Sequence, residues 1–209
     1  MSNDPKDWFE PIPDDFEPPY IPWPESRDRL FTRTGTGHDA PLTDDQKERL
    51  HHLVNGYKMS GDILVEYVEQ NPGFKRRLVY PILFSYRHYL ELALKRLVID
   101  YGTAAGVMLE KKDHGLIRLW ELFLKILIHH GHYGESSSND APTNLVGDRI
   151  KEFNSLDPVS QTFRYPSDRL NAPFSSVPSS IDLSEHKRVI ENISVYLEAA
   201  HSALEPWYG

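Results

Sequence analysis

The chain contains no cysteine among its 209 residues. This absence excludes disulfide-stabilised scaffolds, thiolate zinc sites, iron–sulfur clusters and cysteine nucleophiles. Long apolar runs are also missing, because the longest, around residues 116–128, is interrupted by charged side chains and is too short to span a bilayer. The first residues lack the basic and apolar regions of a signal peptide. We therefore expect a cytoplasmic protein that does not bind a membrane.

Common catalytic and cofactor motifs are missing as well. The sequence has no phosphate-binding P-loop, no Gly-x-Ser-x-Gly, no Gly-x-Gly-x-x-Gly and no His-Glu-x-x-His. His129, His130 and His132 cluster at an expected helix end, but adjacent helical side chains point about 100° apart and do not readily share one ion. We therefore expect neither a metal ion nor a cofactor.

The negative charge is unevenly distributed along the chain. The formal net charge is −8, and residues 1–73 carry 15 acids and 7 bases, whereas residues 74–209 carry 16 of each. A uniformly basic, nucleic-acid-coating protein is thereby excluded. Residues 74–101 are locally basic, with six bases and two acids.

The first 41 residues differ in composition from the rest of the chain. They contain eight of the 16 prolines, which disfavour helices and central strands. They also contain the aromatic residues Trp8, Phe9, Phe16, Tyr20 and Trp23. We predict that residues 1–41 form an extended arm whose aromatic side chains dock on the protein itself or on a partner protein. The alternative is an unstructured tail.

Residues 42–209 show the three- and four-residue apolar periodicity of helices. This pattern predicts an all-α antiparallel bundle of four to five helices. The first helix would begin with a capping box formed by Thr43 and Gln46 and end at residues 71–73. The second would begin near Phe74 or at Pro81 and end at Gly102.

The later helices are predicted from similar signals. Asp113 would cap a third helix, and a fourth would run from about Asn144 to Leu156. Asp157 and Pro158 would open a short extra helical turn. Asp182 would cap the last helix, whose apolar heptad over residues 186–204 suits either a dimer face or an internal core.

The second helix carries the most informative polar residues. Arg87, His88, Glu91 and Lys95 lie within an arc of about 100° on a helix. One interpretation is a solvated face with ordinary ion pairs one turn apart. The other is a polar pocket or an anion- or RNA-binding surface, in which His88 would titrate near neutral pH.

A second cluster follows the fourth helix. Arg164 and Tyr165 precede Pro166, which favours an extended backbone, and Asp168 and Arg169 follow closely. A planar guanidinium at such a break can bind a carboxylate or a phosphate in a forked geometry. Glu91 is a candidate internal partner for Arg164, either as a structural clamp or as part of a site.

Several of these segments together resemble bacterial HEPN-like proteins. The resemblance is carried by Tyr80-Pro81, by residues 84–95 with the pattern Phe-x-x-Arg-His-x-Leu-Glu-Leu-x-Leu-Lys, by His114 with Leu119-Trp120, and by Phe163-Arg-Tyr-Pro-x-Asp168. It covers about residues 74–204. It implies a helical bundle, frequent homodimerisation and, in many members, metal-independent RNA cleavage in toxin or phage-defence systems.

Cleavage by HEPN proteins goes with an Arg and a His four to six residues apart at a helix start. The one such pair here, Arg33 and His38, lies in the arm, outside the region of resemblance. Two hypotheses follow. The first is an interaction module that binds a ligand, a nucleotide or RNA. The second is an endoribonuclease in which His88 or His114 activates a 2′-hydroxyl and Arg164 stabilises the transition state.

Overall fold

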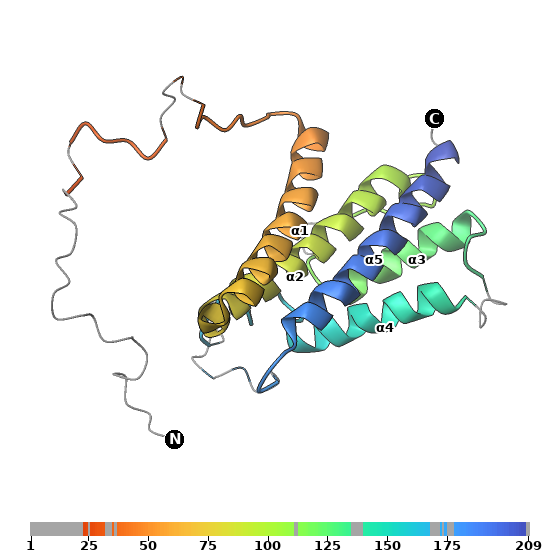
Figure 1. Cartoon of the computed structure of the whole chain (residues 1–209). Helices are drawn as coiled ribbons and strands as arrows, with labels where there is room; N and C mark the ends of the chain where they lie inside the picture. The colour runs from red at the N-terminus through yellow and green to blue at the C-terminus, as the bar shows by residue number, and fades with distance from the viewer. Residues whose placement is uncertain are drawn as a thin grey trace. The chain divides into compact units, whose positions relative to one another are not determined.

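The computed structural model describes residues 23–24, 26–31, 35, 37–110, 113–134, 140–167, 172, 174 and 178–207. The chain divides into two units, Met1–Leu42 and Thr43–Gly209, and each is described by itself. In the described part of the second unit, helices are joined by loops and no strand occurs, which confirms the predicted all-α class (Figure 1). None of the helices in the described ranges is long and apolar enough to cross a membrane.

The first unit is described in short stretches. Within them, the backbone N–H of Gly35 donates to Asp39 Oδ2 at 2.6 Å. Of the five aromatic residues on which the docking prediction rests, Trp23 is described and is 90% exposed, whereas Trp8, Phe9, Phe16 and Tyr20 lie outside the described residues. The docking of the arm therefore stays a prediction. Arg33, which would pair with His38, also lies outside the described residues.

Helices α1 (Gln46–Gln70) and α2 (Lys75–Tyr101) form an antiparallel pair joined by the short 3-10 helix η2 (Pro72–Phe74) (Figure 1). The predicted Thr43 cap is wrong: Asp45 is the N-cap and accepts from the N–H of Glu48 at 2.8 Å, while the Thr43 hydroxyl donates to the Glu48 side chain. Asp45 and Thr43 are both good caps, and only the tertiary path of the chain decides between them.

Helix α2 is the central element of the bundle and contacts α1, α3 and α5. It begins right after Phe74, the first of the two predicted starts, and contains Pro81 in its second turn. Burial extends around much of the helix beyond Pro81 and includes Tyr86, Arg87 and Glu91 as well as its leucines. A stripe on one face was expected, but a central helix buries several faces at once.

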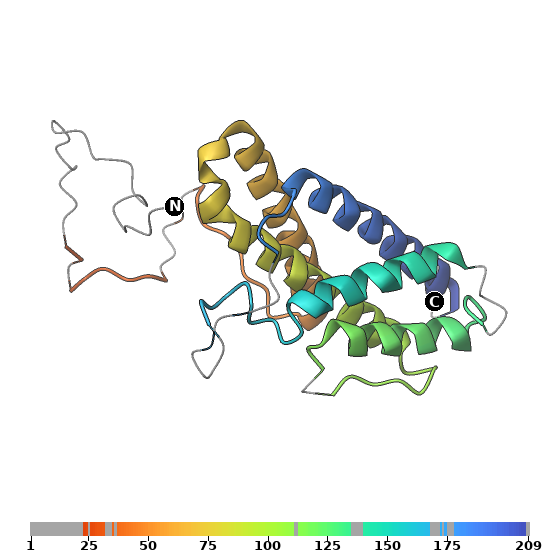
Figure 2. The ribbon, with the colours of Figure 1, turned by 90° about the horizontal axis from the view of Figure 1, so that it is seen from below.

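The remaining helices are α3 (Leu116–His129), α4 (Ala141–Leu156), α5 (Leu183–Leu204) and the terminal 3-10 helix η4 (Glu205–Trp207). Helices α3 and α4 pack side by side (Figure 2). The predicted Asp113 cap of α3 is wrong, because Gly115 is the N-cap and Asp113 instead accepts from the N–H of Glu110 at 2.8 Å. Asp182 caps α5 as predicted and accepts from the N–H groups of Ser184 and Glu185.

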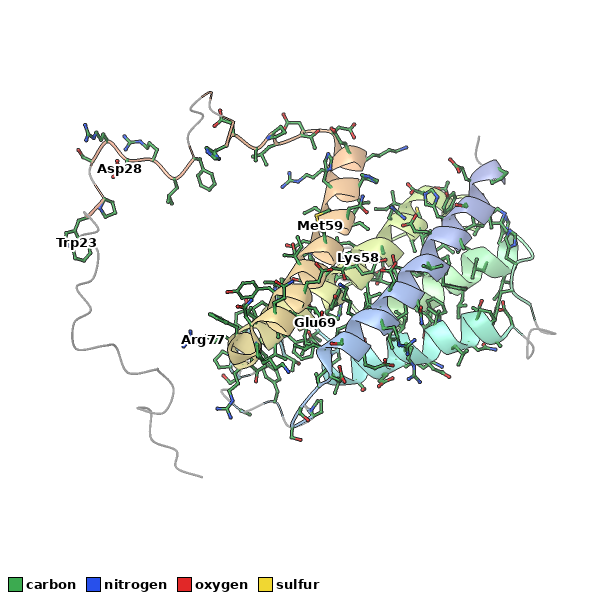
Figure 3. The ribbon with its side chains drawn as sticks, viewed as in Figure 1. Trp23, Asp28, Lys58, Met59, Glu69 and Arg77 are labelled. Atoms are coloured by element: carbon green, nitrogen blue, oxygen red, sulfur yellow. The ribbon has the colours of Figure 1, made fainter. Side chains whose placement is uncertain are left out.

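Helix α5 packs along α1 and α2, and its apolar heptad forms part of the core. Ile190, Ile193 and Leu197 are each at most 3% exposed, so the internal-core alternative is the observed one. On the α1 side that faces α5, Lys58 lies 2.5 Å from Glu191 and Glu69 accepts from Ser184 at 2.6 Å (Figure 3).

Candidate functional site

The centre of the site is a buried arginine on α2. The side chain of Arg87 is fully buried and donates in three directions: Nη1 to Glu91 Oε2 at 3.1 Å, Nη2 to the backbone oxygen of His114 at 3.0 Å, and Nε to the backbone oxygen of Asp157 at 3.3 Å. Burial lowers the pKa of this guanidinium, and the neighbouring carboxylates offset part of that effect. Arg87 thus fastens two loops, those after α2 and after α4, to the same stretch of α2.

Glu91 is the buried acceptor of this cluster. Its side chain is 4% exposed, and its two oxygens accept from different cations: Oε2 from Arg87, and Oε1 from Lys95 Nζ at 2.8 Å. Burial alone would raise the pKa of Glu91, but hydrogen bonds from Lys95 and His114 and the positive charge around it hold the pKa below its usual value. The group is therefore a carboxylate at neutral pH.

His114 reaches the same carboxylate from the loop before α3. Its Nδ1 lies 3.0 Å from Glu91 Oε1 and 3.2 Å from Lys95 Nζ, and its side chain is 59% exposed. A carboxylate only accepts hydrogen bonds and an ammonium group only donates them, so Nδ1 cannot bond to both. The shorter contact, with Glu91, puts the proton on Nδ1 and leaves Nε2 as the acceptor nitrogen in the neutral form of the ring, while Lys95 Nζ donates to Glu91 instead. This arrangement suits a general base at the edge of the protein.

The loop that carries Arg164 is organised by Asp157. This fully buried residue accepts through Oδ1 from the N–H groups of Gln161 at 2.7 Å and Thr162 at 3.1 Å. The residues after Asp157 form turns rather than the predicted short helix, and Ser160 has a positive φ of 57°. The buried ring of Phe163 then anchors the loop against Phe153.

Arg164 lies on an aromatic surface. Its guanidinium carbon is 5.6 Å from the ring centre of Phe84 and 5.5 Å from that of Tyr165, and Nε donates to the backbone oxygen of Ser160 at 2.5 Å. The predicted pairing of Arg164 with Glu91 is wrong. No ion pair joins the two described side chains, because Arg87, Lys95 and His114 already occupy both oxygens of Glu91.

His88 lies among aromatic rings. It stacks on Phe84 with ring centres 5.5 Å apart and meets the edge of Tyr57 at 4.4 Å. Burial is the main cause that lowers the pKa of His88, the charge of Glu91 acts in the opposite direction, and the nearby cations lower the pKa further. Of the two candidate histidines, His114 pairs with a carboxylate, whereas His88 contacts aromatic rings.

The interpretation of the α2 polar residues as a solvated face is wrong for Arg87 and Glu91, which are 0% and 3% exposed. Lys95 is half-buried, whereas Arg164 and Tyr165 are exposed. Asp168 and Arg169 lie outside the described residues. The basic character of α2 is also partly neutralised, since Arg87, Lys95 and Arg96 all pair with carboxylates.

Two contributors to the site were not predicted. Asp157 organises the Arg164 loop, and Phe84 forms the surface on which Arg164 and His88 both lie. The spacing of Phe84, His88, Glu91 and Lys95 by three or four residues was a signal for Phe84, because it puts this ring in the same row on α2. Among the described residues, no three His, Asp or Glu side chains gather in a way that would hold a metal ion.

Comparison of the chain with models of protein families, with curated proteins and with solved structures finds no match. The resemblance to HEPN-like proteins therefore stays a prediction from the residues that carry it.

Proposed function

We propose that this protein is a HEPN-like helical module that binds RNA along the exposed side of one row of α2 residues. This row, called the α2 row below, consists of Phe84, His88, Glu91 and Lys95. The observation that carries the proposal is that Lys95 and His114 meet at Glu91 while Arg164 lies on Phe84, which places cations from different elements along one row of α2. Phe84 and Glu91, which contact these groups, are about 10 Å apart along the helix axis at a rise of 1.5 Å per residue. That spacing suits contacts to a single strand.

Local charge supports this reading in a protein of net charge −8. Arg87 and Lys95 carry two positive charges against the single negative charge of Glu91, so the cluster keeps a net positive charge. Arg164 is held by backbone and aromatic contacts, which leaves its forked Nη donors for an anion. Phosphate contacts of this kind supply most of the affinity of a protein for a nucleic-acid strand.

The test is titration of a labelled single-stranded RNA at low salt with wild type and three variants, Lys95→Ala, His114→Ala and Arg164→Ala. Each variant should bind more weakly, and the slope of log affinity against log salt should fall by about 1 for a lost phosphate contact. Lys187→Ala and His129→Ala are matched controls on α5 and at the end of α3. Binding that is absent in wild type, or equal in all variants, would refute the proposal.

A second candidate function, endoribonuclease activity, is favoured by the contact between Glu91 and His114. In this mechanism His114 Nε2 takes the proton of a 2′-hydroxyl, and the 2′ oxygen attacks the adjacent phosphorus. The bond to the 5′ oxygen breaks, that oxygen takes a proton from water, and the products carry a 2′,3′-cyclic phosphate and a 5′-hydroxyl. A cation beside the phosphate stabilises the extra negative charge of the transition state.

Cleavage is tested with RNA and with the same sequence as DNA, in the presence of a chelator. Only RNA should be cut, and His114→Ala should lower the rate by about 10²–10⁴-fold, as expected for a lost general base. Arg164→Ala tests Arg164 as the residue that stabilises the transition state, and His88→Ala tests His88 as the alternative general base. Cleavage that survives His114→Ala, His88→Ala and Arg164→Ala would show that a contaminating nuclease is responsible.

The resemblance supports two further parts of the proposal: a homodimer, and a role in a defence or toxin-type system. The oligomeric state is measured directly by sedimentation equilibrium of the full chain. A mass of 24.2 kDa at all concentrations would exclude the dimer.

A further inference from the structure

A hollow of about 520 Å³ lies beside Arg164, lined by Tyr80, Phe163, Tyr165, Pro166 and Phe174 among others. Its volume falls in the range of about 300–1,000 Å³ typical of small-molecule sites. Tyr80 and Tyr165 are 51% and 55% exposed, so aromatic surface at the hollow is open to a ligand. Neither the buried Arg87 cluster nor His114 lines this hollow.

Among the described residues that line the hollow, Arg164 is the cation, and its position is fixed before any ligand arrives. Its Nε donates to the backbone oxygen of Ser160, and its guanidinium carbon lies over the rings of Phe84 and Tyr165. Within the described part of the chain it forms no ion pair with a carboxylate. A prepositioned guanidinium without a counter-ion is suited to a phosphate, which accepts two parallel hydrogen bonds from it.

We propose that this hollow binds one nucleotide, with its base stacked on Tyr165 and its phosphate on Arg164. Open aromatic faces bind nucleobases of any type, because every base has a π-face. The inference rests on the proposed function for the source of the nucleotide, which is one unit of the RNA strand. A free nucleoside monophosphate has the same chemistry.

The position of the hollow relative to the α2 row agrees with this assignment. Phe84 joins the two, since Arg164 lies on its ring and His88 stacks against it. A strand whose base occupies the hollow would continue toward Glu91, about two helical turns from Phe84 along α2, where Lys95 and His114 meet the carboxylate. The hollow would then set which nucleotide of a strand lies next to His114.

The test compares two ligands of equal charge: an eight-residue 2′-O-methyl oligoadenylate, which resists cleavage, and an abasic strand of the same length. Tyr165→Ala should weaken binding of the oligoadenylate by about tenfold, the typical effect of removing one stacking partner, and leave the abasic strand unchanged. Tyr165→Phe should bind both like wild type. Arg164→Ala should weaken binding of both, because it removes a phosphate contact.

Tyr67→Ala, an exposed tyrosine on α1 outside the hollow, is the matched control and should bind both strands like wild type. Equal effects of Tyr165→Ala on the two strands, or none, would refute the nucleotide site. If Lys95→Ala and His114→Ala still weaken binding in that case, the proposed RNA surface stands without the hollow. If neither strand binds wild type but adenosine monophosphate binds and needs Tyr165, the hollow is a free-nucleotide site and the RNA proposal is refuted.

Discussion

Arg87 and Glu91 form a fully internal ion pair one turn apart on α2, with Nη1 and Oε2 3.1 Å apart. Such a pair on a solvated helix stabilises by only about 0.2–0.5 kcal/mol. Here both ions are removed from water, and their desolvation is offset by further hydrogen bonds to two loop carbonyls and from Lys95 and His114. The pair therefore connects the stability of the bundle with the geometry of the site.

Replacing Arg87 with Met should lower the free energy of unfolding by about 3–5 kcal/mol, because it leaves Glu91 buried without one of its two cationic partners and takes the donor away from the backbone oxygens of His114 and Asp157. Urea unfolding followed by circular dichroism measures this change. The double variant Arg87→Met/Glu91→Met should be more stable than Arg87→Met alone. Arg188→Met, at an exposed pair with Glu185, should leave the midpoint unchanged. A change below about 1 kcal/mol for Arg87→Met would contradict the buried-pair interpretation.

Helices α1 and α2 approach closely at Gly61, where an added Cβ would lie 2.6 Å from Cε1 of Tyr86. The ring is fully buried and its hydroxyl donates to Asp62 at 2.8 Å, so it has no room to move. We expect Gly61→Ala to destabilise the protein by about 1–3 kcal/mol. Gly56→Ala on the same helix meets no atom within 4 Å and should stabilise it by about 0.5–1 kcal/mol. Similar effects of the two substitutions in urea unfolding would contradict the close approach.

His186 on α5 should make stability depend on pH. Burial lowers its pKa from 6.5 to about 4, and its Nε2 has no hydrogen-bond partner in the described structure. Between these two pH values the unfolded chain binds more protons than the folded one, so the free energy of unfolding rises with pH. The stabilisation is complete above pH 6.5 and is lost as the pH falls through 4.

The measurement is urea unfolding at several pH values for wild type and His186→Gln. The difference between them should change by up to about 1.4 kcal/mol per pH unit in this window. Four other charged side chains line the hollow next to His186: Arg149, Glu152, Asp182 and Glu185. They are present in both proteins, so their titration cancels from the difference in the free energy of unfolding. His129→Gln, at an exposed position, should follow wild type. A constant difference across the window would contradict the buried neutral histidine.

Removing residues 1–41 should increase the affinity of the protein for RNA. The arm carries more acids than bases, and its negative charge opposes the approach of phosphates or competes for the same cations. The comparison uses the full chain and the shortened chain with the labelled RNA at low salt, where charge effects are largest. Unchanged affinity would refute a role of the arm in RNA binding.

Much of the fold was predictable because helical periodicity and caps are local signals. Gly102 and Asp182 were correctly assigned to the ends of α2 and α5. One helix cap was predicted wrongly because two suitable residues, Thr43 and Asp45, lie close together. Another was predicted wrongly because Asp113 accepts a hydrogen bond within the preceding loop instead of capping α3. These choices depend on how the chain enters the bundle, which the neighbouring residues do not encode.

The sequence by itself determined the all-α class, the order of the helices and the concentration of polar candidates on α2. The tertiary structure decided which of those candidates are buried and which cation pairs with which carboxylate. Arg87 differs from an ordinary surface arginine only because the backbone oxygens of His114 and Asp157, 27 and 70 residues away, close over it. Burial and pairing of charges depend on distant segments, whereas periodicity depends on the nearest turns.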